Sequence, residues 1–286
     1  MKALPFKIPK TEQNSFHVQI DEESYFYDTL HQHPEIQLTL ILESTGSLIY
    51  GDYLGAFAPG DIFIIGPNAP HVFRNDPAYY QEESLRAEAM TMFFDQHTFG
   101  QTFLELPEAH ALSQLMLAAE RGMRIRPEAT PGLSTMIKNV FEAQGLSRII
   151  LLLQILNKLS SPTTYDFLTS QLQVRRLNDA EGKRLNDIFR FTMQEYGRPI
   201  KLDEVAAIAN MSPSAFCRYF KQHTRKTYLD FLNEYRIGQA CKLLTNRDKP
   251  VSQVCYDAGF NNLSNFNRKF KEVTGKTPKG YSLGLR

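Results

Sequence analysis

The chain has 286 residues, of which 42% are apolar, and three cysteines without a CxxC pair. This composition is typical of about two globular domains in a reducing compartment, and it argues against a disulfide framework or a zinc finger. Pro5 and Pro9 interrupt the first residues, and the longest apolar run, residues 149–156, is far shorter than the roughly 20 residues of a transmembrane helix. We therefore expect neither a secretion signal nor a membrane span.

Charge is distributed unevenly along the chain. Residues 183–286 contain 19 Lys and Arg against 9 Asp and Glu, a net charge of +10, whereas residues 1–182 contain 13 against 22. A basic C-terminal third on an acidic body is typical of a phosphate-binding domain attached to a domain of another kind.

The first half predicts mainly β-structure up to about residue 95. Apolar residues alternate over 36–42, Gly46 interrupts the pattern, and Leu48 and Tyr50 continue it. This pattern predicts a hairpin of half-buried strands. A second pair of strands is expected on either side of residues 60–61.

Two segments of this half resemble the two motifs of the cupin barrel: residues 31–35, HQHPE, and residues 67–71, PNAPH. The resemblance implies a cupin-like β-barrel over about residues 15–95. By analogy with that fold, we expect a small polar ligand, such as a sugar or a carboxylic acid, inside the barrel. The candidate ligand-binding residues are His31, His33, Glu35, His71 and Arg74.

Cupin enzymes bind a metal through three histidines and a carboxylate. His31, His33 and His71 stand at the histidine positions, but Gln37 stands at the carboxylate position. Because a neutral amide is a poor ligand for a divalent metal, we expect no metal, no cofactor and no enzymatic activity. Two alternatives remain for this half: a ligand-independent dimerisation platform and a metal-dependent cupin enzyme.

Helical patterns follow the strands at residues 107–121 and about 133–160. Their apolar faces predict packing against the barrel, a two-helix dimer contact, or both. A cluster of Ser, Thr and Pro ends the second pattern, and residues 161–182 are expected to be a linker. The next helix begins near residue 183 and carries apolar residues at Leu185, Ile188, Phe189, Met193 and Tyr196.

An internal repeat follows in the basic third. Four residues recur 49 positions later with the same i, i+3, i+4, i+7 spacing, which predicts one buried face on each of two short helices. The first set is Leu202, Val205, Ala206 and Ala209, and the second is Val251, Val254, Cys255 and Ala258. Asn210 and Gly259 come next, and both residue types favour the left-handed conformation of a tight turn.

After the turn the repeat continues at an offset of 50, with Phe216, Arg218, Phe220 and Lys221 matched by Phe266, Arg268, Phe270 and Lys271. Ser212 and Asn262 are expected to cap second helices over about 213–223 and 262–273. Phenylalanines four positions apart would pack on the preceding helix, which is the arrangement of a helix-turn-helix unit. Residues 228–245 predict one helix that connects the two units.

The outward face of each second helix is basic. Arginine is the side chain most often used to read guanine in the major groove, so Arg218 and Arg268 are expected to contact bases. The surrounding basic residues are expected to contact phosphates. They are Lys221, Arg225, Lys226, Lys269, Lys271 and Lys276.

Residues 183–286 strongly resemble the AraC family of bacterial regulators. The resemblance rests on VCYDAGFNNLSNFNRKFK at 254–271, TGKTPKGY at 274–281 and LDEVAAIANMSPSAFCRYFK at 202–221. It implies base-facing positions at Ser214, Cys217 and Arg218 in the first copy, and at Leu263, Ser264, Asn267 and Arg268 in the second. Cys217 departs from the polar residue usual at its position.

The combined expectation is an α+β chain with an N-terminal cupin-like barrel and flanking helices over residues 1–160, and an all-α domain over 183–286 with two helix-turn-helix units joined by a long helix. It is a sequence-specific transcriptional regulator that binds double-stranded DNA. The family resemblance further implies an activator, a homodimer, contact with RNA polymerase, and a location on the bacterial nucleoid in the cytoplasm. The candidate DNA-binding residues are Ser212, Ser214, Cys217, Arg218, Lys221, Asn262, Leu263, Ser264, Asn267, Arg268 and Lys271.

Overall fold

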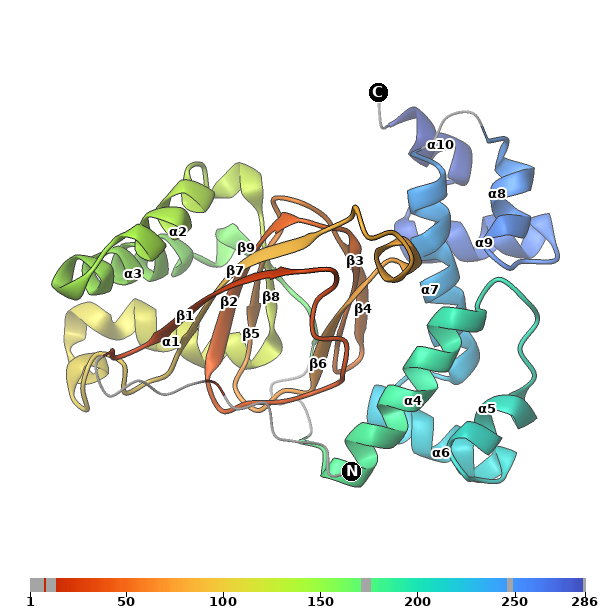
Figure 1. Cartoon of the computed structure of the whole chain (residues 1–286), viewed down its shortest axis with the longest axis horizontal. Helices are drawn as coiled ribbons and strands as arrows, with labels where there is room; N and C mark the ends of the chain where they lie inside the picture. Colours follow the sequence, from red (N-terminus) through yellow and green to blue (C-terminus); the bar gives the residue numbers. More distant parts are fainter. Residues whose placement is uncertain (1–7, 9–13, 171–175, 246–248, 285–286) are drawn as a thin grey trace. The chain divides into compact units, whose positions relative to one another are not determined.

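The computed structural model describes residues 8, 14–170, 176–245 and 249–284. The chain divides into two compact units, Met1–Asp179 and Ala180–Arg286. The first unit is rich in strands and the second is helical (Figure 1). The α+β class expected from the sequence is therefore confirmed. Within the described ranges, no helix is both long and apolar enough to cross a membrane.

The strands of the N-terminal unit form two antiparallel sheets. The larger sheet has the order β1 (His17–Glu23), β7 (Ala87–Phe94), β2 (Ile36–Glu43), β5 (Ile62–Ile65), β8 (Met123–Ile125) and β9 (Tyr165–Phe167). The smaller sheet has the order β4 (Tyr53–Phe57), β3 (Gly46–Tyr50) and β6 (His71–Asn75). Among the described strands the two ladders do not join into one closed ladder, so the closed barrel implied by the cupin resemblance is not confirmed.

Both predicted hairpins had the wrong strand partners. β2 pairs with β5 and β7, whereas β3 pairs with β4 and β6, so the strands on either side of Gly46 belong to different sheets. The strands on either side of residues 60–61, β4 and β5, are likewise in different sheets. β2 and β3 are also buried on both faces over most of their length, rather than half-buried. Alternation reports the two faces of a strand, but it does not identify the neighbouring strand.

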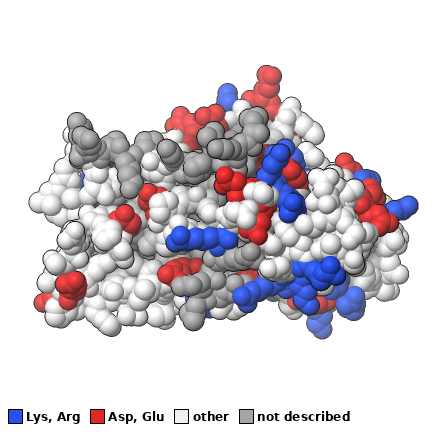
Figure 2. Space-filling view, turned by 90° about the horizontal axis from the view of Figure 1, so that it is seen from below, with Lys and Arg blue, Asp and Glu red and all other residues white. Residues whose placement is uncertain are grey.

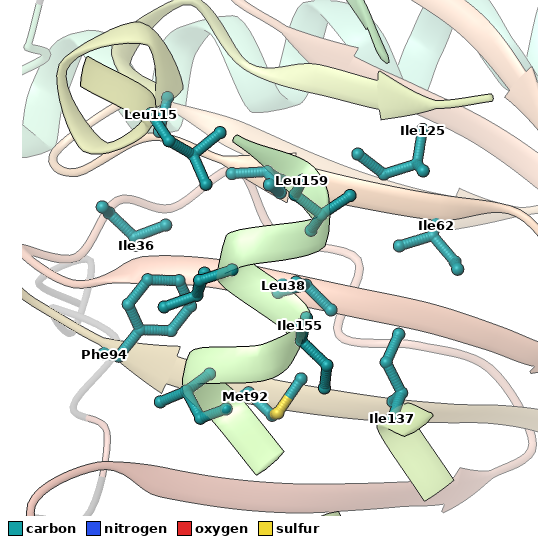
Figure 3. Close-up of a cluster of buried hydrophobic side chains, with 14 of the residues drawn as sticks. Ile36, Leu38, Ile62, Met92, Phe94, Leu115, Ile125, Ile137, Ile155 and Leu159 are labelled. Atoms are coloured by element: carbon teal, nitrogen blue, oxygen red, sulfur yellow. The ribbon is translucent and has the colours of Figure 1, made fainter. Parts of the chain in front are cut away.

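The helices of this unit cover one face of the larger sheet. They are α1 (His110–Ala118), α2 (Leu133–Glu142) and α3 (Gly145–Leu159). The unit also contains the short 3-10 turns η1 (Pro77–Tyr80), η2 (Phe103–Glu105), η3 (Pro107–Ala109), η4 (Ala119–Arg121), η5 (Pro127–Ala129) and η6 (Pro162–Thr164). Figure 3 shows Ile155 and Leu159 of α3 among side chains of the sheet, including Leu38 and Met92. Each such buried aliphatic side chain contributes about 1.5–3 kcal/mol.

Two expectations for this region need correction. The pattern over residues 133–160 is two helices rather than one, because Ala143 and Gln144 leave the helical conformation for extended backbone. The expected linker at 161–182 begins as part of the N-terminal unit, because β9 pairs with β8 and extends the sheet. Residues 171–175 of that linker lie outside the described residues.

The helices of the C-terminal unit are α4 (Asp179–Glu195), α5 (Leu202–Ile208), α6 (Pro213–Thr224), α7 (Tyr228–Leu243), α8 (Val251–Asp257), α9 (Leu263–Thr274) and α10 (Pro278–Leu283). α7 runs between the α5–α6 pair and the α8–α9 pair (Figure 1). The two second helices begin at Pro213 and Leu263 and end at Thr224 and Thr274, and all four ends lie within one residue of the bounds expected from the repeat.

The repeat is packed as its spacing predicts, except that Leu202 is exposed and Val251 is only partly buried. Val205, Ala206 and Ala209 are buried, as are their counterparts Val254, Cys255 and Ala258. Phe216, Phe220, Phe266 and Phe270 have no exposed surface. Leu202 is 36% exposed. It is the first residue of α5, so only part of its side chain reaches the helices on which the rest of the stripe packs.

Candidate nucleic-acid interface

Each second helix of the repeat begins with the same local construction. Asn210 and Gly259 both have positive φ angles, 54° and 84°, which turn the chain sharply after α5 and α8. Ser212 Oγ then accepts a hydrogen bond from the Ala215 backbone N–H at 3.4 Å, and Asn262 Oδ1 accepts one from the Asn265 N–H at 3.0 Å. These caps begin α6 and α9 at equivalent positions of the two units.

The face of α6 and α9 opposite the buried phenylalanines is exposed. The sets Ser214, Cys217, Arg218, Lys221 and Ser264, Asn267, Arg268, Lys271 both follow i, i+3, i+4, i+7 spacing, so each set lies along one side of its helix. All eleven candidate DNA-binding residues are exposed; the remaining three are Ser212, Asn262 and Leu263. Figure 2 shows Lys and Arg side chains gathered on the visible face of the C-terminal unit, at the right of the view.

Arg268 is held along the outer surface of α9. Its Nη2 donates to Asn265 Oδ1 at 2.9 Å, its Nη1 lies 3.3 Å from Glu272 Oε2, and 64% of its side chain is exposed. These partners lie one turn before and one turn after it on the same helix. The guanidinium is therefore presented to solvent with its direction restrained by neutral and acidic neighbours on α9.

Two of the lysines expected to contact phosphate face other parts of the unit. Lys226 forms an ion pair with Glu234 of α7. Lys269 Nζ lies 3.4 Å from Asp230 Oδ1 of α7 and 3.2 Å from Glu272 Oε2, and only 14% of its side chain is exposed. The helical spacing of these residues did not show that α7 offers carboxylates beside them.

The three cysteines differ in their surroundings. Cys217 is exposed on the outer face of α6, whereas Cys241 is partly buried and Cys255 is fully buried. Burial raises the pKa of the Cys241 thiol to about 11 and also raises that of Cys255. The thiols of Cys241 and Cys255 are therefore protonated near pH 7.

A cavity of about 90 Å³, lined by both polar and aromatic side chains, lies in the N-terminal unit. The strand registers place Gln19, Thr91 and Thr39 side by side across β1, β7 and β2. The cavity is lined by Gln19, Asp21, Phe26, Tyr27, His31, Gln37, Thr39, Phe73, Ala89, Thr91 and Phe93. Burial raises the pKa of Asp21. The described lining contains no Lys or Arg.

Of the five residues expected to bind a ligand, His31 alone lines this cavity. His33 and His71 are buried behind it, and Arg74 is buried with its Nη2 donating to the backbone oxygen of Asp28 at 2.8 Å. Glu35 lines a different cavity of about 150 Å³. Gln19, Asp21, Thr39 and Thr91 also line the cavity and were not among the residues predicted from the sequence. The alternation of polar residues at 17, 19, 21 and 23 was a signal for an inward polar face on β1.

The three histidines are close together, with ligand atoms within 4.8 Å of one another. Burial is the main cause of a lowered pKa in all three histidines. The pKa of His31 is lowered to about 4, the pKa of His33 is lowered, and the pKa of His71 is lowered well below its ordinary value. His31 and His71 each donate from Nδ1 to a backbone oxygen at 2.8 Å, Thr29 O and Ala69 O respectively. All three rings are therefore neutral near pH 7.

The Gln37 amide connects this cluster to the cavity. His33 Nε2 lies 3.0 Å and His71 Nε2 3.1 Å from Gln37 Oε1, and the Gln37 amide donates to Thr39 Oγ1 at 2.8 Å. Thr39 is in turn 3.1 Å from Thr91 Oγ1. The donor set has three imidazoles but no carboxylate, so it does not match the metal site of the cupin enzymes. The hydrogen bond from His33 Nε2 to Gln37 Oε1 and the one from the Gln37 amide to Thr39 Oγ1 orient the Gln37 and Thr39 side chains at the cavity wall.

Comparison with known proteins identifies the C-terminal unit. A family model described as "Helix-turn-helix domain" matches residues 205–283. The chain is 32% identical to the uncharacterized regulator YdeC of Bacillus subtilis over 39% of this chain and 38% of that protein. It is 26% identical to the probable transcriptional regulator LumQ of Photobacterium leiognathi over 95% of this chain and 98% of that protein.

Two further matches cover smaller shares of the chain. The chain is 28% identical to the transcriptional activator RhaS of an Enterobacter species over 41% of this chain and 44% of that protein. The solved DNA-binding domain of AdpA, in complex with a target DNA, matches 36% of this chain and 93% of that domain, with 26% identity and a TM-score of 0.34. With the duplicated capped helices and the family match, the C-terminal unit of this chain is a helix-turn-helix DNA-binding domain of the AraC type.

Proposed function

We propose that this protein is a transcriptional regulator that binds specific DNA sequences through α6 and α9 and activates transcription in response to a small neutral ligand. The observation that carries the DNA-binding part is the repeated outward face, with Arg218 and Arg268 at equivalent places on the two helices. An arginine near the N-terminal half of a helix in the major groove reads guanine through two parallel hydrogen bonds.

The connecting helix supports binding by one chain to two successive turns of DNA. α7 has 16 residues, a length of about 24 Å. Successive major-groove segments on one face of a duplex are about 34 Å apart. α6 and α9 both pack against α7, and on this proposal they enter adjacent groove segments.

Selection of bound duplexes from a random pool at about 150 mM salt tests this proposal. We expect enrichment of one motif with two half-sites about one helical turn apart. The Arg218→Ala/Arg268→Ala variant should lose the motif. The Arg86→Ala/Arg190→Ala variant removes two exposed arginines outside α6 and α9, and it should retain the motif. Retention of unrelated sequences by all three proteins would mean non-specific phosphate binding and would overturn the proposal.

The cavity in the N-terminal unit favours an uncharged ligand over a carboxylic acid. Its lining offers amide, hydroxyl and imidazole groups beside Phe26, Phe73 and Phe93, with Asp21 as its charged residue. A buried carboxylate needs a cationic or several N–H partners, and repulsion from Asp21 adds to the cost of its burial. A polyhydroxylated molecule such as a small sugar matches the mixture of donors and acceptors.

Thermal unfolding in the presence of sugars and of carboxylic acids distinguishes these ligand classes. A ligand at 100 times its Kd adds about 2.7 kcal/mol of stability. We expect stabilisation by a neutral polyol, and its loss in the Thr39→Val/Thr91→Val variant. Stabilisation by acids alone would overturn the assignment of ligand class. No stabilisation by any compound would favour the alternative, a ligand-independent dimerisation platform.

We further propose that α2 and α3 mediate a homodimer and that the regulator contacts RNA polymerase. Leu146 and Ile150 are one turn apart on α3 and are 70% and 45% exposed, which supports a dimer contact there. The Leu146→Glu/Ile150→Glu variant should sediment as a monomer. Leu117→Glu, at a 61% exposed position on α1, is the matched control. A dimer that survives the double variant would contradict this interface.

A further inference from the structure

Arg236 is a buried arginine near the middle of α7, with 9% of its surface exposed. Its Nε donates to the backbone oxygen of Tyr196 at 2.8 Å, and its Nη2 donates to the backbone oxygen of Arg198 at 2.7 Å. Both oxygens lie just beyond the last residue of α4, where helix carbonyls lack partners within the helix. Arg236 therefore holds the chain between α4 and α5 against α7.

The other side of the same guanidinium meets the second helix-turn-helix unit. Its central carbon lies 5.8 Å from the centre of the Phe260 ring. Gly259, in the turn between α8 and α9, approaches so closely that a Cβ atom there would lie 2.2 Å from the Tyr196 oxygen and 2.9 Å from Arg236 Nε. The tight approach requires glycine, both for space and for the positive φ of 84°.

These contacts join the two DNA-reading halves through one side chain. On the side of the first half, Arg198 Nη1 lies 2.9 Å from Glu204 of α5. On the side of the second half, Phe260 packs 5.3 Å from Phe266 of α9, measured between ring centres. Arg236 thus lies between the first helix of one unit and the recognition helix of the other.

Burial of the Arg236 guanidinium costs free energy, so its two hydrogen bonds to backbone oxygens must offset that cost. Burial penalises a guanidinium and lowers the pKa of Arg236, and an apolar side chain would fill the same volume without that penalty. What an apolar side chain cannot do is hydrogen-bond two backbone oxygens at once. Lysine carries one compact ammonium in place of a planar fork, so it cannot reproduce this geometry either.

We propose that Arg236 is a positioning residue that sets the distance between the two recognition helices and thereby makes the protein selective for the spacing of two DNA half-sites. This inference rests on the proposed function, because it requires that α6 and α9 both read DNA. It adds a second kind of specificity to base reading. Inserting one base pair between half-sites changes both their separation and their relative rotation, which a rigid pair of helices does not tolerate.

The test compares operators that differ only in spacing. The probes are the duplex enriched from the random pool and versions with one base pair added or removed between its half-sites. For the unaltered protein we expect a change of spacing by one base pair to raise Kd about tenfold or more. This loss of affinity is similar to the one that a mismatched base pair causes. For Arg236→Met the ratio of Kd at altered spacing to Kd at the original spacing should fall below about threefold. This variant should also bind the original duplex more weakly. Arg190→Met, at an exposed position on α4, should keep the full ratio.

Two further variants keep the test decisive if Arg236→Met does not fold. Arg236→Lys keeps the charge, and Gly259→Ala keeps Arg236 but adds the Cβ atom that would separate the halves. Both should also lower the spacing ratio. A change that weakens binding to all duplexes by the same factor, with the ratio retained, would show that Arg236 serves stability alone and would overturn the proposal.

A measurement without DNA separates failure of this inference from failure of the proposed function. Spin labels at Cys217 on α6 and at Val273→Cys on α9, in a Cys241→Ala/Cys255→Ala background, report the distance between the recognition helices. We expect a narrow distance distribution that broadens or shifts in Arg236→Met and not in Arg190→Met. An unchanged distribution in Arg236→Met would overturn the positioning role, even if the protein binds DNA as proposed.

Discussion

Lys269 of the second recognition helix and Asp230 of the connecting helix lie 3.4 Å apart between Nζ and Oδ1. Lys271, two positions further along α9, is exposed on the outer face. Two lysines that are nearly adjacent in sequence therefore have different partners. Lys269 connects α9 to α7, whereas Lys271 is available to a phosphate.

Because of this difference, we expect Lys271→Ala to change DNA binding and Lys269→Ala to change stability. Lys271→Ala should weaken binding to all sequences alike and reduce the slope of log K against log salt by about 1. Lys269→Ala should leave that slope unchanged and lower the free energy of unfolding by about 0.2–1 kcal/mol, a small value because Asp230 is half exposed. Binding titrations at several salt concentrations and denaturant unfolding measure both. Equal changes in slope would contradict the assignment.

Arg268→Ala should act on specificity rather than on general affinity. Losing a bidentate contact to guanine costs about 1–3 kcal/mol and should relax the preference at one base pair. Competition titrations with duplexes substituted at each position of the selected motif give the profile. A uniform loss of affinity at every position would place Arg268 among the phosphate contacts.

The buried histidines predict that the N-terminal unit loses stability in acid. Burial lowers the pKa of His31 from 6.5 to about 4 and lowers that of His71 well below 6.5. Below pH 6.5 the unfolded chain binds protons that the folded chain does not, so stability present above pH 6.5 falls as the pH drops toward 4. The upper limit is about 1.4 kcal/mol per pH unit for each histidine.

The free energy of unfolding, measured at pH 7 and at pH 5, checks this prediction. The difference between the two free energies should shrink in the His31→Gln/His71→Gln variant. Substitution of the exposed His110 by Gln is the control and should leave it unchanged. A pH dependence that persists in full without His31 and His71 would assign it to other groups.

Metal analysis tests the alternative of a cupin enzyme. The cluster of His31, His33 and His71 lacks an anionic ligand because Gln37 occupies that position. We therefore expect substoichiometric iron, manganese and zinc in protein purified without a metal-affinity tag. One metal ion per chain, lost in His71→Gln, would favour the enzyme.

The C-terminal unit was predictable from the sequence because its signals are local. The caps at Ser212 and Asn262, the turns at Asn210 and Gly259, and phenylalanines four apart each act within one or two helical turns. The partners of Lys226, Lys269 and Arg236 were not predictable, because they depend on how α7 packs against residues up to 40 positions away.

The N-terminal unit was less predictable because strand pairing is not local. Alternation showed that residues 36–42 form a strand, but it did not indicate that β7, some 50 residues later, lies beside it. The cavity depends on the same pairing, since the register places Thr39 opposite Thr91 and Gln19 next to them. Motif resemblance directed attention to the histidines instead, and these mostly lie behind the cavity wall.

We propose above all that α6 and α9 of one chain read two neighbouring segments of the major groove. Kd measured for Arg218→Ala and for Arg268→Ala, against every single-base substitution of the selected duplex, tests it most directly. We predict that each variant loses discrimination in a different half-site, with the two centres about 10 base pairs apart. Loss of discrimination at the same base pairs in both variants, or at none, would contradict the claim.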